Sequence, residues 1–144
     1  MEQSAHHNRF HLLDWVAAEV FPGYLAHSDL AVCVDFPCVE TLVGTRTRLL
    51  EAMVNGLPVL MTRGTELSED LAAAGIGWVV PSGDPQVLAD RIVACAQDRE
   101  ATGEMAKRSK LWVQERFSIE RTLAPVLQWI EGPVFAPDNA VKQI

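Results

Sequence analysis

The sequence predicts an α/β fold in which helices cover both faces of a parallel β-sheet, the doubly wound layer structure. Two runs of apolar, β-forming residues, 30–34 and 57–61, lack the polar alternation of a strand with one solvent-facing side. Such runs are typical of strands buried on both faces of a parallel sheet. Helix-start and helix-stop residues fill the intervals between the runs. Strands that alternate with helices favour parallel pairing through right-handed crossovers.

The first thirty residues are expected to lead into this sheet. Residues 1–9 are polar and predict a flexible lead-in. A hydrophobic segment at 10–20 precedes the tripeptide Phe-Pro-Gly, which predicts a turn at 21–23. Residues 24–28 are expected to form one helical turn before the strand at 30–34.

A helix over about 47–55 is expected after the loop that follows this strand. Thr45 or Thr47 can cap its start, because a threonine hydroxyl accepts a hydrogen bond from a first-turn amide. Gly56 can end it, because glycine readily adopts the left-handed conformation at a helix stop. The second buried strand, 57–61, comes directly afterwards.

The second half of the chain is expected to add one strand and four helices. The clearest start is Asp84-Pro85, a capping carboxylate followed by proline at the first helical position. Three strands are fewer than the five or six of a usual open sheet, so the sheet is expected to be incomplete. The expected elements are a helix at 66–74 capped by Thr65 and ended by Gly75, a strand at 78–80, a helix from Pro85, a helix at about 100–116, a helix from Ser118 to Trp129, and a tail at 132–144.

Composition and charge exclude several classes of protein. The net charge of -7 argues against a general nucleic-acid binder, because little would neutralise phosphates over a broad surface. No apolar run approaches the roughly 18 residues of a membrane span, and the first residues do not resemble a signal peptide. The three cysteines lack metal-ligand spacing and are expected to be reduced. We expect a cytoplasmic protein whose contact with a membrane, if it has one, is peripheral and at the inner face.

The stretch from Glu40 to Pro58 carries the residues best suited to a ligand. In a parallel α/β sheet, ligands bind at the carboxyl ends of the strands, beside helix N-termini whose free amides and partial positive charge suit a phosphate. A glycine lets the backbone approach a ligand, threonines offer hydroxyl groups, and arginines pair with a diphosphate in a planar, bidentate way. The candidate diphosphate ligands are Gly44, Thr45, Arg46, Thr47 and Arg48.

Glu51 is the candidate for a second part of the ligand. It follows Thr47 by about one helical turn and lies at the margin of the apolar face formed by Leu49, Leu50 and Met53. A carboxylate in that place can accept two hydrogen bonds from neighbouring hydroxyl groups, such as those of a ribose.

Four ordered motifs resemble those of the family 4 (group 1) glycosyltransferases. Residues 48–59, RLLEAMVNGLPV, resemble the LLEAMACGLPV segment of that family. The resemblance extends over about residues 12 to 130. Residues 24–30, YLAHSDL, resemble the family's Y-L-x-x-A-D-V entry, residues 77–85 its G-x-x-V-P-x-G-D-P turn, and residues 115–118 its E-R-F-S signature.

The resemblance implies a Rossmann-like, three-layer GT-B carboxy-terminal domain over residues 10–131 that binds a nucleoside-diphosphate sugar. It implies transfer of the sugar to a glycan or lipid-linked acceptor with retention of configuration, without an obligatory metal and without a cofactor. Glu51 matches the second glutamate of the family's E-x7-E motif, which binds the donor's ribose. The loop before it matches the segment that gives backbone amides to the diphosphate and sugar.

Two departures from the family pattern bear on activity. Val43 stands where the first glutamate of E-x7-E is expected. Glu40-Thr41 instead resembles an E-T variant of some bacterial surface-polysaccharide glycosyltransferases, which makes Glu40 the candidate catalytic carboxylate. The family's carboxy-terminal domain begins with further β-α units that carry a G-R-x-x-x-x-K-G segment, and neither this segment nor an acceptor-binding amino-terminal domain is recognisable. The resemblance therefore implies a sheet that is incomplete at its amino-terminal side. The chain is therefore expected to be a fragment, a truncated reading frame or one piece of a split enzyme.

Simpler interpretations compete at each position. Arg48 and Glu51 have the i,i+3 spacing of an ordinary helical ion pair, and Glu40 could be an ordinary loop carboxylate. The basic cluster at 107–110 is typical of a solvated helix face. The competing function is a non-catalytic module that binds nucleotide weakly or that completes the sheet of a partner chain, or of a second copy, through an exposed edge.

Overall fold

Three parallel strands form the sheet. In the computed structural model, which describes residues 7–134, the second strand lies between the other two and pairs with both. Leu60 of the middle strand lies opposite Val32 on one side and Trp78 on the other. All four residues of the middle strand are buried, as its uninterrupted apolar run predicted. In sheet order the strands are β1 (Ala31–Cys33), β2 (Val59–Thr62) and β3 (Trp78–Val80).

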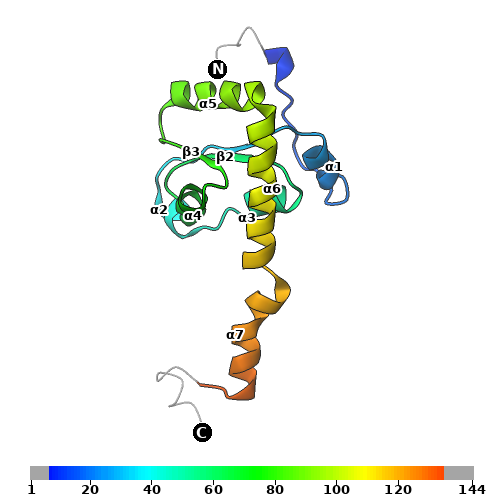
Figure 1. The fold of residues 1–144 in the computed structure, drawn as a ribbon, viewed down its shortest axis with the longest axis vertical. Helices are drawn as coiled ribbons and strands as arrows, with labels where there is room; N and C mark the ends of the chain where they lie inside the picture. The colour runs from blue at the N-terminus through cyan, green and yellow to red at the C-terminus, as the bar shows by residue number, and fades with distance from the viewer. Residues whose placement is uncertain (1–6, 135–144) are drawn as a thin grey trace.

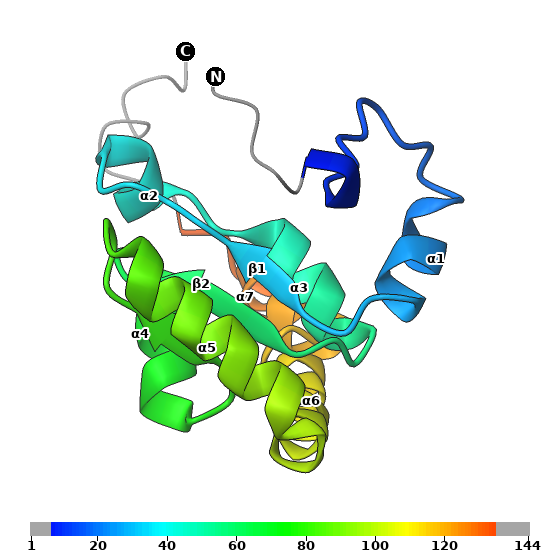
Figure 2. The same ribbon diagram turned by 90° about the horizontal axis from the view of Figure 1, so that it is seen from above.

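Helices cover the sheet on both faces. Figure 1 shows α5 above the sheet and α3 and α4 below it, while α6 runs down from the level of α5 past α3. Figure 2 shows the same layers from above. Strands in the order β1-β2-β3 joined by right-handed crossovers place α3 and α4 on the same face. The helices are α1 (Phe21–Ala26), α2 (Val39–Val43), α3 (Thr47–Val54), α4 (Glu66–Ala74), α5 (Pro85–Gln97), α6 (Arg99–Arg116) and α7 (Ile119–Glu131), preceded by the 3-10 turn η1 (His7–Arg9).

The core lies between the sheet and the helices below it. Met53 of α3 and Leu71 of α4 are fully buried in one cluster with Val59 and Met61 of β2. Val113 of α6 closes the same cluster. The core therefore fixes α3, and with it the residues at its start, against the central strand.

Three helix starts predicted from capping residues are confirmed. In each, a side-chain oxygen accepts a hydrogen bond from an amide of the first turn, which satisfies a donor that the helix leaves unpaired. Gly75 ends α4 in the left-handed conformation, with φ of 61°, as predicted. The confirmed caps are Thr65 (to the Ser68 amide), Asp84 (to the Gln86 and Val87 amides) and Ser118 (to the Arg121 amide).

The structure corrects two predictions before and after β1. The predicted turn at 21–23 is wrong, because α1 already begins at Phe21. Pro22 stands in its first turn, where the missing amide hydrogen costs nothing. The segment after β1 is not a simple loop, since it contains the five-residue helix α2. The side chain of Thr41, which is buried, accepts a hydrogen bond from the Cys38 amide at 2.9 Å and fixes the start of α2.

The predicted capping of α3 by Thr45 or Thr47 is also wrong. Arg46 occupies the N-cap position, and no side chain makes a capping hydrogen bond there. The carbonyl of Arg46 accepts the amide hydrogen of Leu49 at 2.9 Å. Because neither threonine hydroxyl accepts a hydrogen bond from the first turn of α3, both are available to other partners.

The carboxy-terminal helix differs from the others in its surroundings. Figure 1 shows α7 extending away from the body beyond α6, and none of its residues is buried. No helix among residues 7–134 is long and apolar enough to cross a membrane. The predicted lead-in and tail lie in part outside the described residues, at 1–6 and 135–144.

Candidate functional site

The carboxyl ends of the three strands bring together polar residues that are distant in sequence. Asp35 follows β1, Thr62 is the last residue of β2, and Ser82 follows β3. Because the strands are parallel, these ends meet at one edge of the sheet, which is where ligands bind in open α/β folds.

Thr62 and Ser82 hold the main chain of Asp35. The Asp35 amide donates to Thr62 Oγ1 at 2.8 Å, and this hydroxyl in turn donates to the Asp35 carbonyl at 3.0 Å. Ser82 Oγ donates to the same carbonyl at 2.9 Å. All three strand ends therefore fix the position of one aspartate.

The Asp35 carboxylate forms a two-point ion pair with Arg46. Arg46 Nε donates to Oδ2 at 2.9 Å, and Arg46 Nη2 donates to Oδ1 at 3.1 Å. Both side chains are mostly buried, with 19% of Asp35 and 16% of Arg46 exposed. The Arg46 hydrogen bonds lower the pKa of the Asp35 carboxyl below its usual value, against the opposing effect of burial. Asp35 is therefore ionised and sets the orientation of Arg46.

A thiol completes this cluster. Cys33 Sγ donates to Asp35 Oδ2 at 3.3 Å. Burial raises the pKa of the Cys33 thiol to about 11, and the hydrogen bond to Asp35 acts in the same direction. Cys33 is therefore a neutral donor at physiological pH rather than a nucleophile.

Glu40 and Gly44 lie on the other side of Arg46. Glu40 belongs to α2, its side chain is 83% exposed, and its Oε1 lies 3.9 Å from Arg46 Nη1. Gly44 ends α2, and a Cβ on it would lie 2.6 Å from the Glu40 carbonyl oxygen and 3.2 Å from Arg46 Nη1. Gly44 is thus required by the close approach of the Glu40 carbonyl, in addition to any role toward a ligand.

The start of α3 presents the other predicted diphosphate ligands. Thr45, Thr47 and Arg48 are exposed, whereas Leu49 is buried in the core. Arg46 and Arg48 therefore differ, because the first is held by Asp35 and the second is open to solvent.

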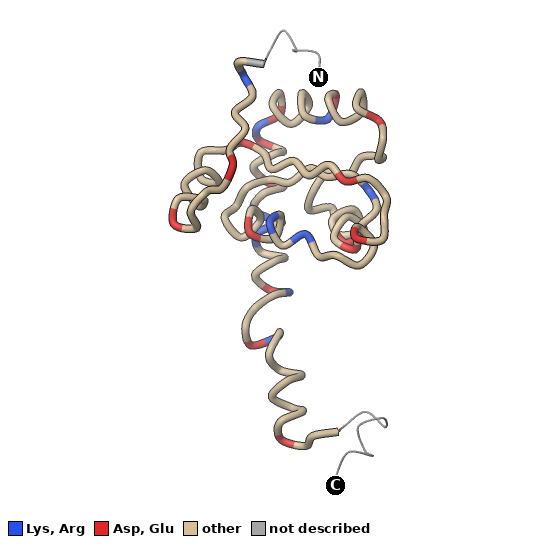
Figure 3. The backbone as a smooth tube through the Cα atoms, turned by 180° about the vertical axis from the view of Figure 1, so that it is seen from behind, with Lys and Arg blue, Asp and Glu red and all other residues tan. Residues whose placement is uncertain are grey.

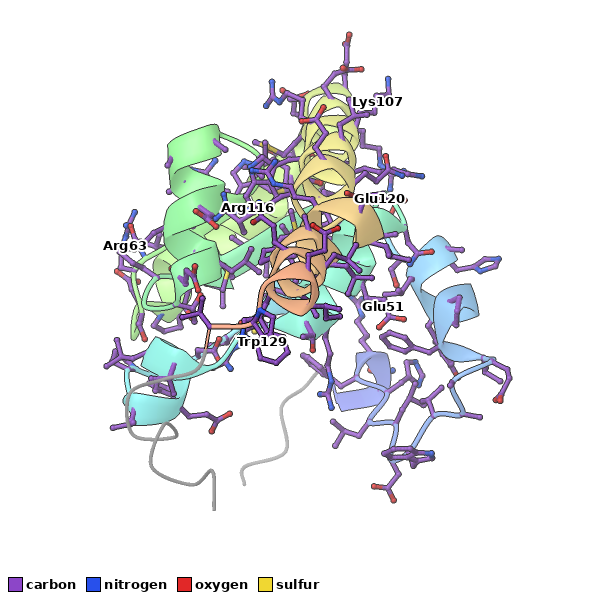
Figure 4. All side chains as sticks on the ribbon, turned by 90° about the horizontal axis from the view of Figure 1, so that it is seen from below. Glu51, Arg63, Lys107, Arg116, Glu120 and Trp129 are labelled. Carbon is purple, nitrogen blue, oxygen red and sulfur yellow. The ribbon has the colours of Figure 1, made fainter. Side chains whose placement is uncertain are left out.

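Glu51 projects from α3 into solvent. Figure 4 shows its side chain on the α1 side of the body, away from α4. The simpler interpretation, an ion pair between Arg48 and Glu51, is not formed within residues 7–134. The structure therefore brings Glu40 and Arg46 together and leaves Glu51 with an uncommitted carboxylate.

The sequence-based prediction missed the cluster of Cys33, Asp35, Thr62 and Ser82. One signal was available, since Asp35 is the first charged residue after a predicted buried strand. The other contacts join residues 27 and 47 positions apart and depend on the assembled sheet.

Among residues 7–134, no group of three or more histidine, cysteine or acidic side chains could hold a metal ion. Figure 3 shows the acidic and basic positions of the described residues interspersed along the backbone.

Comparison with known proteins identifies the family. The family described as glycosyl transferases, group 1, matches residues 1–98. WcaL of Escherichia coli (strain K12), named as a colanic acid biosynthesis glycosyltransferase, is 36% identical over 89 residues, which cover 59% of this chain and 22% of that protein. WcaL of Salmonella typhimurium is 34% identical over 91 residues, with 60% and 22% covered. The matched part spans less than a quarter of either relative.

Solved structures of Anabaena HepE share the fold. The complex of HepE with UDP-glucose aligns with a TM-score of 0.60 and 26% identity over 73% of this chain and 29% of HepE. The complex with UDP aligns with a TM-score of 0.63 and 26% identity over 78% and 30%. The predicted Rossmann-like parallel sheet of the GT-B carboxy-terminal type is therefore confirmed. The family match and the shared fold together show that the chain belongs to the group 1 glycosyl transferases.

Proposed function

We propose that residues 10–131 form a donor-binding domain that holds a nucleoside-diphosphate sugar at the carboxyl edge of the sheet, for transfer to a glycan or lipid-linked acceptor. The observation that carries the proposal is the Asp35–Arg46 pair, which fixes a guanidinium at that edge beside the start of α3. The HepE structures, which contain UDP-glucose or UDP, support the choice of ligand.

Arg46 and the start of α3 would bind the diphosphate. Asp35 occupies Nε and Nη2 of Arg46, so the Nη1 donors are left to point at a phosphate. The exposed side chains of Thr45, Thr47 and Arg48 add donors beside the partial positive charge of the helix start. Asp35 is in this scheme a positioning residue that acts through Arg46.

Two glutamates would contact the rest of the donor. The uncommitted carboxylate of Glu51 would accept hydrogen bonds from the ribose hydroxyl groups. Glu40, whose Oε1 lies near Arg46 Nη1, would lie by the sugar as the catalytic carboxylate. The bound donor would therefore lie with its ribose at Glu51, its diphosphate at the start of α3 and its sugar at α2.

The chemistry would depend on charge and position. In glycosyl transfer the bond between the anomeric carbon and the diphosphate oxygen breaks, the acceptor hydroxyl oxygen bonds to that carbon, and the hydroxyl proton passes to the leaving diphosphate. Negative charge then grows on the leaving diphosphate, and pre-oriented donors from Arg46, Arg48 and the helix start would stabilise it. The donor-binding domain contributes these phosphate-binding groups. Residues outside this set must bind the acceptor.

A second candidate function is a non-catalytic module in the same fold. Among the described residues, β1 pairs with β2 alone, and its other edge offers unpaired backbone groups to another strand. Such a module would complete the sheet of a partner chain or of a second copy, with nucleotide binding weak or absent.

Titration with UDP, GDP and dTDP tests the donor site. At a ligand concentration about 100 times its Kd, binding to the folded chain adds about 2.7 kcal/mol to the free energy of unfolding. We expect one of the three nucleotides to raise the melting temperature accordingly. If none of them does, the chain has no donor site of its own and the second candidate is favoured.

Two variants test the ribose assignment. Glu51→Ala is expected to weaken nucleotide binding by about tenfold, because it removes hydrogen bonds to a charged acceptor. Glu131→Ala, at the exposed end of α7, is the matched control and should bind as the parent does. Equal affinities for all three proteins would exclude Glu51 from the site.

A further inference from the structure

A cavity of about 620 Å³ lies at the edge of the sheet opposite to the candidate donor site. Its lining includes Leu30, which precedes β1, and Pro58, which precedes β2. Asp35 and Thr62 mark the other ends of the same two strands, so the cavity and the donor site lie at opposite ends of the sheet. A volume of this size is ordinary for a small-molecule site.

The floor of the cavity is apolar. Leu30 and Pro58 line it from the sheet, Ile92 and Cys95 from α5, and Ala106 from α6. Pro58, Cys95 and Ala106 are buried. This surface suits the apolar part of a ligand.

One face of α6 adds three basic side chains to the wall. Arg99, Lys107 and Lys110 all line the cavity, and their spacing of eight and three positions places them along one side of the helix. They are a quarter of the 12 lysines and arginines in a chain of net charge -7. The cavity therefore carries a local positive charge, with Asp29 as the only acidic residue in its lining.

The existing ion pairs leave these cations open to a ligand. Arg99 lies 3.2 Å from Asp29, and Lys107 lies 2.6 Å from Glu104, but the four side chains are largely exposed and such pairs are weak. Lys110 is half-buried and makes no ion pair within residues 7–134. An anion can therefore bind Lys110 without displacing a partner.

A glycine in the second turn of α6 keeps the cavity open. Gly103 lines it, and a Cβ built on this residue would meet no atom within 4 Å. Packing therefore does not require glycine there, although glycine is unfavourable in a helix interior. Because Gly103 has no side chain, there is space between Arg99 and Lys107. Through this space the apolar part of a ligand can reach the apolar floor of the cavity.

We propose that this cavity is a second ligand site, which takes a phosphate monoester with an apolar substituent. Three cations around one opening suit a phosphate dianion, and the ammonium group is a compact phosphate binder. The apolar floor would hold the substituent. This site is separate from the proposed donor site and does not depend on it.

Hexyl phosphate is a probe of both parts of the site, with inorganic phosphate and 1-hexanol as controls for each part. Measured by calorimetry on the whole chain, hexyl phosphate should bind at least about tenfold more tightly than either control, since each control lacks one set of contacts. Its affinity should not change when UDP is present. Competition by UDP, or equal binding of hexyl phosphate and inorganic phosphate, would overturn the proposal.

Substitutions in the cavity test whether hexyl phosphate binds there. Lys110→Gln should weaken binding of hexyl phosphate about tenfold, and Gly103→Leu should abolish it by filling the cavity. Arg121→Gln on α7 removes an exposed charge outside the cavity and should leave binding unchanged. Circular dichroism shows whether each variant is folded, and a folded Gly103→Leu variant that still binds hexyl phosphate would contradict the proposal.

Discussion

Asp35 and Arg46 form a two-point ion pair in which both carboxylate oxygens accept a hydrogen bond from one guanidinium, at 2.9 and 3.1 Å. The pair links the end of β1 to the start of α3. Because Thr62 and Ser82 hold the main chain of Asp35, the guanidinium is fixed relative to all three strands. This rigidity has consequences that can be measured.

Asp35→Asn should destabilise the fold and weaken the proposed donor site. The variant removes the charge of a mostly buried pair, which we expect to lower the free energy of unfolding by about 1 to 2 kcal/mol, as measured by urea denaturation. Glu69→Gln is the control, because its pair with Arg63 is about half exposed on both sides and should change stability by less than about 1 kcal/mol. An equal effect of the two variants would show that the Asp35 pair is no more than a surface contact.

The same pair predicts how stability depends on pH. The folded protein holds the pKa of Asp35 below its unfolded value, so the unfolded chain takes up a proton first as the pH falls. The stabilisation is therefore complete above the unfolded pKa of about 4 and is lost as the pH falls further, through the folded pKa. The stability difference between the parent and Asp35→Asn should be constant at neutral pH and shrink below about pH 4. A difference that does not depend on pH would mean that charge is not its source.

The cysteines should differ in reactivity. Cys33 is half-buried with its pKa raised to about 11, and Cys95 is buried, whereas Cys38 is exposed at the start of α2. Alkylation requires the thiolate and access to it. Iodoacetamide at pH 8 should therefore modify Cys38 first, as followed by peptide mass spectrometry, while Cys33 reacts early only if the Asp35 cluster is not formed. Asp35→Asn is a useful comparison, since it should speed the reaction of Cys33.

Local chemistry determined which parts of the fold were predictable. Asp84 followed by proline, and Thr65 followed by a helix-forming segment, mark helix starts within a few residues, and both are confirmed. The uninterrupted apolar run of β2 likewise identified a strand buried on both faces. These local signals gave correct elements, whereas the Phe-Pro-Gly turn at 21–23 and the threonine cap of α3, also predicted from short segments, were wrong.

Contacts between distant segments determined what was missed. Helix α2 is stabilised by the buried side chain of Thr41, whose burial depends on the rest of the fold. Arg46 was predicted to bind phosphate directly, but nothing in its neighbours indicated that Asp35, 11 positions earlier, would orient it. The ligand role of the residues at the start of α3 thus stays a prediction, and the group that positions one of them was visible only in three dimensions.

Gly44→Ala should disturb the proposed donor site more than the fold. A Cβ at this position would lie 2.6 Å from the Glu40 carbonyl oxygen, a backbone atom, and 3.2 Å from Arg46 Nη1. The end of α2 and the guanidinium must both shift, so we expect nucleotide affinity to fall by about tenfold, a loss of about 1.4 kcal/mol of binding free energy. Neither Gly44 nor Arg46 belongs to the core cluster, so the melting temperature should fall by no more than it does in Asp35→Asn. Gly103→Ala is the matched control, since nothing lies within 4 Å of its added methyl group. That control should leave nucleotide binding unchanged and stabilise α6 by roughly 1 kcal/mol, as alanine does in place of glycine within a helix. Unaltered nucleotide affinity in a folded Gly44→Ala protein would place the diphosphate away from Arg46 and α2.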